Sequence, residues 1–448
     1  MTSRTWNNGP GGGTPITAAA LNGMESDIAG AAGNASTALA NAATAQTAAT
    51  TAGSDATSAA NVTQPLTAAA LSAAYARSGL RKRDLPRMPT VLPPSMATPP
   101  TEATSGPGGA GPIASPTTLP YNTPNVTFLG SVPVHITALS TDYFQNQINS
   151  QNGSGAQACA VEFDYYGAAF SIIYRAASAG SSYWWVWVDG IPATAAPVAW
   201  ANASSNSKYY HGVTFATAAL RRIRIYYSGA DFGGMQVKAT DSVVPTAKPG
   251  WSVAMLGDSY TQATGATSAL QAFPTTLGML LGCETFLCGI AGTGYTAGVV
   301  FGDPSRTAPI LTANPRYVVI VGSINDQAAT PTTVGAAATA LYSWFATNLP
   351  ATKLFVAGVQ PSNGMATTGN NVANNAALKT AALAAPNVVT FIDPYTDVWF
   401  TGTGHVGATV GDGNRDIFMW TDGIHPSQDG HDYWARRLYA DIAAALTA

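Results

Sequence analysis

The feature that most constrains the fold is an alternation, in residues 249–448, between short continuous apolar runs and Ala-rich segments. Continuous apolar runs are typical of strands buried on both faces of a parallel sheet, and Ala-rich segments favour helices. The runs lie at residues 252–256, 317–321, 354–359 and 388–392, and the segments at 268–282, 333–349, 371–385 and 428–445. This alternation predicts a doubly wound, flavodoxin-like α/β domain whose site lies at the carboxyl ends of the strands.

Four blocks of glycine and polar residues stand where such a site is expected. Two of them follow the predicted strands at 252–256 and 317–321, one follows a short apolar run at 285–288, and the fourth precedes the final helix. In chain order the blocks contain Gly257, Asp258 and Ser259; Gly289, Gly292 and Gly294; Gly322, Asn325 and Asp326; and Asp422, His425 and Pro426. A single block is weak evidence, because a serine can cap a helix and the other blocks can form turns. Their joint occurrence in this order favours a catalytic site.

The residue types in the blocks are those that nucleophilic acyl transfer requires. A serine hydroxyl is a weak nucleophile, so Ser259 needs a neighbouring base, for which His425 is the candidate. Asp422 precedes His425 by three residues and can orient the imidazole and stabilise its protonated form. The oxyanion of the tetrahedral intermediate needs preorganised donors. We expect these to be the backbone N–H groups of Ser259 and Gly292 and the side-chain amide of Asn325.

Together the blocks resemble those of the SGNH (GDSL-like) hydrolase family, which includes esterases, lipases and carbohydrate deacetylases. Gly257-Asp258-Ser259 matches the serine block and Gly292 the glycine block. Residues 322–326 match the Gly-x-Asn-Asp block with one extra residue, and Asp422 with His425 matches the Asp-x-x-His block. The resemblance implies a serine ester hydrolase without cofactor or metal. Its catalytic residues would be Ser259, Asp422 and His425, and its oxyanion hole Ser259, Gly292 and Asn325.

Aromatic residues flank these blocks. Tyr260 stands where the family often has leucine, Tyr295 follows the glycine block, and Trp420 precedes the Asp-x-x-His block. We expect the three side chains to shape a pocket for the acyl group or a sugar. His431, at the start of the final helix, is expected to be a cap or surface residue.

Residues 123–248 predict a second domain of a different class. Short β-branched and aromatic runs alternate with turn residues, among them the hairpin-like Asp189-Gly190. This is typical of an all-β sandwich of the jelly-roll type. Alternation along a strand places Trp185 and Trp187 on one face and Trp184 on the other. These rings could stack on sugars, but we expect the sandwich core to contain at least one of the two faces.

Residues 1–76, a short tip followed by an Ala-rich segment, predict a thin helical stalk. Apolar residues occupy one heptad seam throughout, at positions 21, 24, 28, 31, 35, 38, 42, 45, 49, 52, 56 and 59, and nine of the twelve are Ala. An Ala seam buries little area on one helix, so we expect an oligomer, by analogy with fibres a homotrimer. A frayed low-complexity linker is the alternative. Residues 77–122, rich in Pro and Gly, are predicted to be a linker without regular elements.

Charge, hydropathy and cysteine count exclude several classes. Charged residues are 10% of the chain and the formal net charge is −3, so the basic excess of a nucleic-acid binder is missing. No apolar run approaches the roughly 18 residues of a membrane-spanning helix, and the first residues lack the apolar core of a secretion signal. Three cysteines are too few for a disulfide framework. We expect buried thiols, although Cys283 and Cys288 could pair.

Residues 9–22 resemble the start of minor tail or fibre proteins of phages that infect actinobacteria. This resemblance implies a location in the virion, with the stalk bound to other tail proteins and the last two domains at the host envelope. The combined prediction is a tail-associated serine esterase that removes acyl groups, most simply O-acetyl, from host envelope glycans or glycolipids. The alternatives are a receptor-binding tail protein whose hydrolase fold serves adhesion, and a secreted carbohydrate esterase unrelated to phage.

Overall fold

The computed structural model describes residues 93–106, 111–130, 132–138, 141–147, 158–176, 180–359, 370–396, 398–402 and 413–447. All of these lie in one compact unit, Pro65–Ala448. The predicted stalk falls outside the described residues. Within the described ranges, no helix is both long and apolar enough to span a membrane.

The C-terminal domain is built on a parallel sheet of five strands. These are β13 (Ser252–Gly257), β14 (Glu284–Gly289), β15 (Tyr317–Val321), β16 (Lys353–Ala357) and β17 (Val388–Ile392). They are ordered β14-β13-β15-β16-β17, which is the flavodoxin-like order of a doubly wound sheet. The chain reverses direction across the sheet beside β13, and ligands bind outside the carboxyl ends of the strands at such a point.

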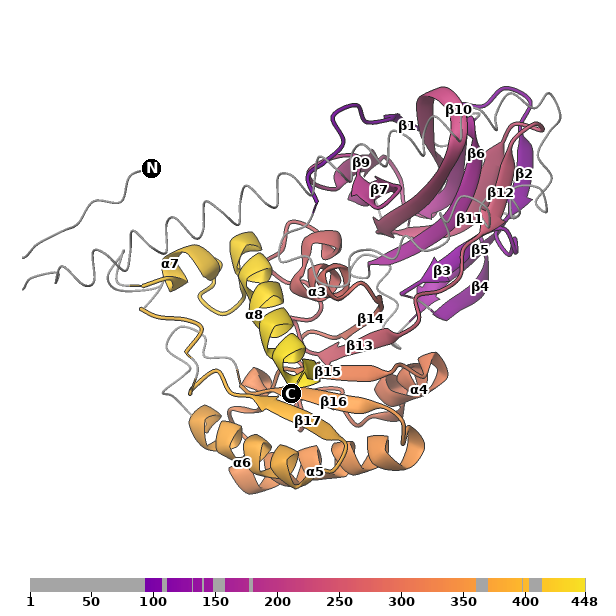
Figure 1. Cartoon of the computed structure of the whole chain (residues 1–448). Helices are drawn as coiled ribbons and strands as arrows, with labels where there is room; N and C mark the ends of the chain where they lie inside the picture. The colour runs from indigo at the N-terminus through magenta and orange to yellow at the C-terminus, as the bar shows by residue number, and fades with distance from the viewer. Residues whose placement is uncertain are drawn as a thin grey trace, which may run out of the picture. The chain divides into compact units, whose positions relative to one another are not determined.

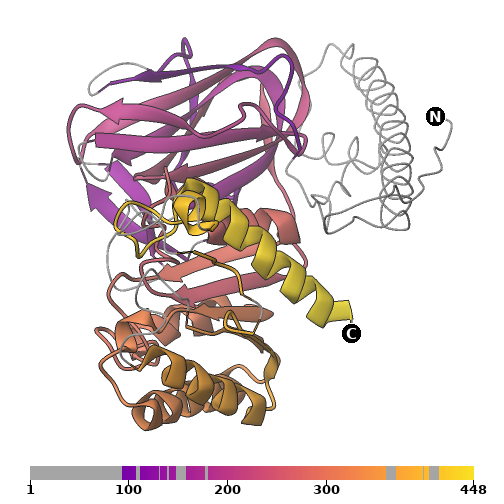
Figure 2. The ribbon, with the colours of Figure 1, turned by 90° about the vertical axis from the view of Figure 1, so that its left-hand side faces the viewer.

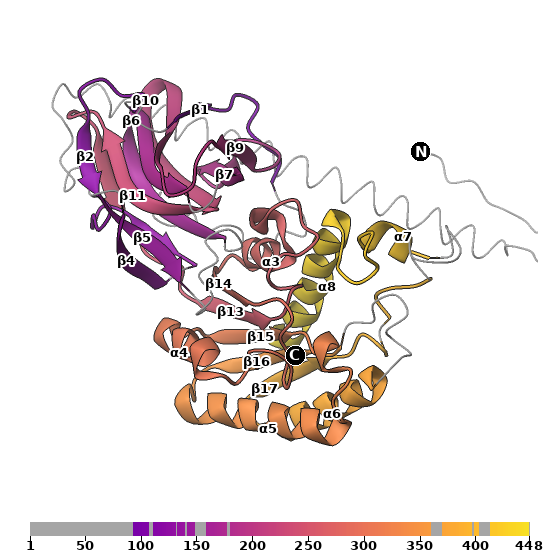
Figure 3. The same ribbon diagram turned by 180° about the vertical axis from the view of Figure 1, so that it is seen from behind.

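Helices cover both faces of this sheet. They are α3 (Phe273–Leu281), α4 (Pro304–Ala313), α5 (Pro331–Asn348), α6 (Asn371–Ala384) and α8 (Gln428–Thr447), with shorter turns η2 (Ala269–Gln271), η3 (Ile324–Asp326) and α7 (Arg415–Phe418). Val253 and Met255 of β13 face one core with α3 and α8. Ala254 and Leu256 face the other core with α4, α5 and α6. Figures 1 and 2 show α8 on one side of the sheet and α5 and α6 on the other, and Figure 3 shows α4, α5 and α6 from behind.

The β domain is an antiparallel sheet of twelve hydrogen-bonded strands. They are β1 (Thr101–Ser105), β2 (Thr117–Pro120), β3 (Thr127–Leu129), β4 (Val132–Ala138), β5 (Thr141–Gln147), β6 (Cys159–Ala176), β7 (Gly180–Val188), β8 (Ile191–Pro192), β9 (Val198–Asn202), β10 (Lys208–Ser228), β11 (Ala230–Val237) and β12 (Ser242–Pro245). β6 and β10, of 18 and 21 residues, pair with each other and together with β1, β3, β7, β11 and β12. Because they join the strands into one continuous sheet, the strand order does not establish a jelly roll.

The turn between β7 and β8 is the predicted Asp-Gly hairpin. Asp189 and Gly190 both have positive φ, 53° and 81°, and Val188 pairs with Ile191 across them. Positive φ at both central residues is the geometry of a type I′ turn, whose twist matches that of the flanking strands.

The predicted linker at residues 77–122 is wrong in its second half. β1 pairs with β10, and β2 pairs with β11. The β domain therefore begins no later than Thr101. The Pro and Gly clusters flank these two strands without interrupting them. Their Thr and Ser residues adopt extended backbone readily when a longer strand supplies the pairing.

The three tryptophans of β7 occupy two different cores. Trp184 is buried with the interior side chains of the β domain. Trp185 and Trp187 belong to the cluster that contains Leu270 and Phe273 of the C-terminal domain. The predicted alternation is confirmed, but both faces are buried, so none of the three rings is free to stack on a sugar. One face of β7 therefore packs against the α/β domain.

Candidate active site

Ser259 lies in the turn that leaves the carboxyl end of β13. The last strand residue is Gly257, where a β-carbon would stand 2.4 Å from the Val321 carbonyl oxygen, so only glycine lets β13 and β15 approach this closely. The backbone N–H of Tyr260 donates to Asp258 Oδ1 at 3.0 Å, and the Thr264 N–H donates to the Ser259 carbonyl at 3.0 Å. These bonds hold the turn with Ser259 7% exposed.

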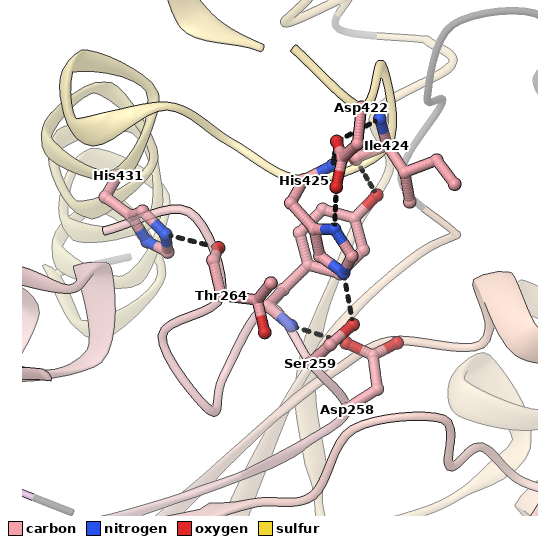
Figure 4. A network of polar contacts seen from close by, with 8 residues as sticks. Asp258, Ser259, Thr264, Asp422, Ile424, His425 and His431 are labelled. Carbon is pink, nitrogen blue, oxygen red and sulfur yellow. Dashed lines mark hydrogen bonds and ion pairs between the residues drawn. The ribbon is translucent and has the colours of Figure 1, made fainter. Parts of the chain in front are cut away.

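Ser259, His425 and Asp422 form a continuous hydrogen-bonded series (Figure 4). Ser259 Oγ lies 2.8 Å from His425 Nε2, and His425 Nδ1 lies 2.6 Å from Asp422 Oδ2. With the carboxylate on Nδ1, the neutral imidazole carries its proton there, and Nε2 is left to accept from the serine hydroxyl. The geometry therefore gives the nucleophile a base and the base an orienting carboxylate.

Asp422 is held in its charged form by its own loop. Burial alone would raise its pKa. Hydrogen bonds from the His425 side chain and from the His425 and Ile424 backbone N–H groups lower the pKa below its usual value. Oδ1 accepts those two N–H groups at 3.0 and 2.8 Å, while Oδ2 faces the imidazole. A carboxylate that stays ionised can stabilise the imidazolium formed during proton transfer.

The loop that carries Asp422 and His425 is a closed turn. Met419 pairs with Pro426 in a β-bridge, the Trp420 N–H donates to the His425 carbonyl at 2.7 Å, and Gly423 provides the positive φ of 68°. Tyr260 then fixes this turn to the serine turn, because its hydroxyl donates to the Ile424 carbonyl at 2.6 Å. The base and the nucleophile are thus connected by a second contact besides their own.

The other two predicted oxyanion donors, Gly292 and Asn325, follow β14 and β15, the two strands that flank β13. None of the described residues accepts a hydrogen bond from the backbone N–H of Ser259 or of Gly292. Gly292 has φ of 72° in the loop after β14, and Asn325 lies in η3, after β15. The Asn325 amide donates one hydrogen to the Thr293 carbonyl at 2.9 Å, which leaves its second hydrogen for a ligand.

Residues 255–433 match the model of the GDSL-like lipase/acylhydrolase family. The C-terminal domain is a GDSL-like hydrolase domain. The domain is therefore a serine ester hydrolase by class. No curated protein sequence matches the chain.

Solved structures share the fold over more than the GDSL-like domain. A family two carbohydrate esterase from Cellvibrio japonicus matches with TM-score 0.56 and 12% identity, over 78% of this chain and 99% of that one. A salicylyl-acyltransferase from a tetracycline biosynthetic pathway matches with TM-score 0.57 and 13% identity, over 73% and 98%. An acetyl xylan esterase from Butyrivibrio proteoclasticus matches with TM-score 0.51 and 12% identity, over 75% and 99%. The covered shares extend well beyond residues 249–448, so the likeness in fold includes much of the β domain.

Two of the aromatic residues predicted to line a pocket in the GDSL-like domain do not do so. Tyr260 is 1% exposed and stacks on Trp434 of α8 at 5.0 Å between ring centroids. Tyr295 is 4% exposed, with its hydroxyl 2.8 Å from that of Tyr342 in the core beneath the sheet. Proximity in sequence to a catalytic block does not determine which way a side chain points. Trp420, in contrast, is 45% exposed beside the His425 loop, and its pocket role remains a prediction.

His431 is a structural residue that the sequence did not reveal. It is fully buried, not a surface residue as predicted. Its Nδ1 accepts from the Phe273 N–H at 3.2 Å and its Nε2 donates to the Thr264 carbonyl at 3.0 Å (Figure 4). Burial lowers the pKa of His431 to about 4, so the ring is neutral at physiological pH and fastens the end of the serine turn to α8.

The Asn325 block has one residue more before Asn325 than the family pattern, because Ser323 and Ile324 both stand between Gly322 and Asn325. Ser323 has a positive φ of 84°, a conformation that costs a non-glycine residue free energy. Its hydroxyl donates to Asp326 Oδ2 at 2.7 Å, which offsets part of that cost.

In the described residues, no group of three or more His, Cys, Asp or Glu side chains could hold a metal ion.

Proposed function

We propose that the GDSL-like domain hydrolyses acyl esters, most simply O-acetyl esters, on a carbohydrate or glycolipid, with Ser259 as nucleophile. The observation that carries this proposal is the hydrogen-bonded series Ser259–His425–Asp422 beside the predicted oxyanion donors of Gly292 and Asn325. These groups supply the three requirements of acyl transfer: a nucleophile, a base and an oxyanion site.

The reaction follows from this geometry in two steps. Ser259 Oγ attacks the ester carbonyl carbon while its proton moves to His425 Nε2, and the carbonyl oxygen becomes an oxyanion facing the donors. Collapse of this intermediate breaks the ester bond, and His425 returns the proton to the departing sugar hydroxyl. Water then attacks the acyl-serine with His425 again as base, releasing the carboxylic acid and free Ser259.

Two observations support a sugar ester as substrate. Similar folds occur in an acetyl xylan esterase and a family two carbohydrate esterase. The names of both proteins give carbohydrate esters as their substrates. The exposed Trp420 beside His425 offers an aromatic face of the kind on which sugar rings stack. Acyl transfer to another alcohol, as in the salicylyl-acyltransferase of similar fold, needs the same first step and differs only in the acceptor.

The test compares wild type with Ser259→Ala on p-nitrophenyl acetate and on an O-acetylated polysaccharide, with acetate release followed by mass spectrometry. We expect release by wild type and none by Ser259→Ala, with the two proteins indistinguishable in thermal unfolding. Equal release by both proteins would exclude Ser259 as the nucleophile.

We also propose that the enzyme is carried on a phage tail, bound to other tail proteins through a trimeric stalk. Support comes from residues 9–22, which resemble the start of actinobacteriophage tail proteins, and from the Ala seam of the heptads in residues 21–59. An esterase in that position would act on the host envelope. If Ser259→Ala phage adsorb and infect normally, adhesion is the main role of the domain; delayed infection by the variant supports deacylation.

A further inference from the structure

Arg306, in the first turn of α4, is fully buried, and the mechanism above does not use it. Its guanidinium donates to four oxygen acceptors, none of which is a carboxylate. These are the carbonyls of Gly257, Cys288 and Val299, at 2.7, 2.7 and 3.1 Å, and the hydroxyl of Thr293 at 3.0 Å. Burial lowers the pKa of Arg306 to about 10, so the group keeps its charge at neutral pH. A buried charge that bonds only neutral acceptors costs free energy, so its position needs a reason.

The four acceptors belong to the two segments that carry the predicted backbone oxyanion donors. The Gly257 carbonyl precedes Ser259 by two residues. Cys288 is the next-to-last residue of β14, just before the Gly292 loop, and Thr293 follows Gly292 directly. A planar guanidinium with donors in a fixed fork holds such acceptors in one relative arrangement. Arg306 therefore joins the segment that carries Ser259 to the Gly292 loop, beside the backbone bond from the Ile290 N–H to the Gly257 carbonyl.

Asp326 holds the same loop from its other side. Its carboxylate accepts the backbone N–H groups of Tyr295, Thr296 and Ala297 at 2.9, 2.8 and 3.0 Å. Gly294 allows this approach, because a β-carbon there would lie 2.5 Å from Asp326 Oδ2. The neighbouring Asn325 donates to the Thr293 carbonyl. The loop is irregular, so these contacts with two buried charges of opposite sign take the place of helix or sheet hydrogen bonds.

We propose that Arg306 is the positioning residue of the oxyanion hole, tying the Ser259 turn to the Gly292 loop so that their N–H groups converge on one point. This inference rests on the proposed function, in which those N–H groups stabilise the tetrahedral intermediate. Arg306 touches no reacting atom, and its effect reaches the substrate only through the backbone that it holds.

The experiment uses the full chain with Arg306→Met, Arg306→Lys, Thr293→Val and Thr293→Ser. Steady-state hydrolysis of p-nitrophenyl acetate gives kcat and KM. The rate of phosphonylation by a p-nitrophenyl phosphonate measures how well the oxyanion hole stabilises a negatively charged oxygen. In that reaction Ser259 Oγ bonds to phosphorus, p-nitrophenolate leaves, the serine proton passes to His425, and the phosphoryl oxygen occupies the hole. Circular dichroism and thermal unfolding establish that each variant is folded.

We expect Arg306→Met to lower kcat and the phosphonylation rate by about 100-fold with KM changed less than about threefold, since a misplacement of about 1 Å costs on the order of 10² in rate. Arg306→Lys retains the charge without the fork, so it should recover part of the loss. Thr293→Val removes, at nearly constant volume, the bond from Arg306 and the bond that the Thr293 hydroxyl donates to the Ile290 carbonyl at 2.7 Å. It should lower both rates by about tenfold, whereas Thr293→Ser keeps the hydroxyl and should resemble wild type.

Arg224→Met is the control for loss of a buried guanidinium, because Arg224 pairs with Glu162 in the β domain. It should lower the melting temperature while kcat stays within about twofold of wild type. A folded Arg306→Met with kcat and phosphonylation near wild type overturns the inference. If Arg306→Met does not fold, Thr293→Val decides, and wild-type rates in that variant overturn the inference alone. A wild type that neither hydrolyses the aryl acetate nor is phosphonylated at Ser259 overturns the proposed function and the inference with it.

Discussion

Tyr260→Phe isolates the contact that connects the base loop to the serine turn. The substitution removes one hydroxyl, which donates to the Ile424 carbonyl at 2.6 Å, and leaves the ring stacked on Trp434. Ile424 stands between Asp422 and His425, so this hydrogen bond acts on the segment that positions the imidazole. The Ser259–His425–Asp422 series itself is chemically untouched.

The size of the effect follows from the burial of the hydroxyl. Tyr260 is 1% exposed, and a buried hydrogen bond contributes a net 0.5–1.5 kcal/mol, roughly, while an acceptor left unsatisfied costs about 1–3 kcal/mol. We expect unfolding stability to fall by about 1–2 kcal/mol. If the bond contributes about 1.4 kcal/mol to holding the loop in its productive position, its loss lowers the productive fraction, and with it kcat, about tenfold.

The assay pairs p-nitrophenyl acetate hydrolysis with urea unfolding, and Tyr165→Phe is the control. Tyr165 is fully buried in the β domain, and its hydroxyl donates to the Ala169 carbonyl at 2.7 Å. Tyr165→Phe should lose at least as much stability with kcat unchanged. If Tyr260→Phe also loses stability while kcat stays at the wild-type value, the Tyr260 tether has no part in positioning His425 and the reasoning is refuted.

Three further predictions follow from the same structure. Asp422→Asn should lower kcat by about 10⁴-fold with little change in KM, because the amide no longer selects the productive tautomer of His425; a loss below tenfold in aryl acetate hydrolysis would contradict this role. Burial lowers the pKa of His431 from 6.5 to about 4 in the folded protein. Between these values the folded state binds fewer protons than the unfolded state. The contribution of His431 to stability is therefore lost as pH falls from 6.5 to 4, at about 1.4 kcal/mol per pH unit. Asp258 has a folded pKa of about 7, raised from 3.8 by burial, so it has the opposite sign and destabilises the fold as pH rises from 3.8 to 7. We therefore compare the free energy of urea unfolding between pH 4.5 and 6.5. It should rise more steeply with pH in Asp258→Asn than in wild type, and less steeply in His431→Gln. Parallel curves for the three proteins would exclude both assignments. Light scattering should give a trimer for the full chain and a monomer for a chain beginning at Pro93, and a monomeric full chain would count against the stalk.

The α/β domain could be predicted from the sequence because its signals are local. Four of the five strands appear as continuous apolar runs, and each catalytic block follows a strand or precedes a helix. Parallel strands bring their carboxyl ends to one edge, so chain order alone indicated that Ser259 and Asn325 share a site. The pairing of His425 with Ser259 came from the chemistry of the residue types and from the family resemblance, since the final loop follows no strand of the sheet.

What the sequence could not reveal depends on partners distant in the chain. The aromatic and β-branched runs at residues 161–166 and 170–174 are separated by Gly167 in the sequence, but both belong to the single strand β6, because β10 pairs with both of them on either side of a register shift. β1 gains its stability from β10, more than 100 residues later. The orientation of Tyr260 depends on Trp434, and Trp187 is buried by a neighbouring domain. Arg306 left no motif at all, since its acceptors are mostly backbone carbonyls, which every residue has.

The distribution of buried charge distinguishes the site from the rest of the GDSL-like domain. The chain has few charged residues, 10%, yet Asp258, Arg306 and Asp326 are all at most 1% exposed. Asp258 and Asp326 are adjacent in sequence to Ser259 and Asn325, and Arg306 donates to Thr293, the residue after Gly292. A core of apolar side chains would fold with less desolvation cost. Loops that converge on a ligand cannot satisfy their polar backbone groups through helices or sheets, however, and a buried arginine and carboxylate can each satisfy several at once. Asp258 Oδ2 and Arg306 Nε still have no partner among the described residues, so the arrangement is not optimal for stability. We infer that the cost is retained because it fixes the backbone donors that the reaction requires.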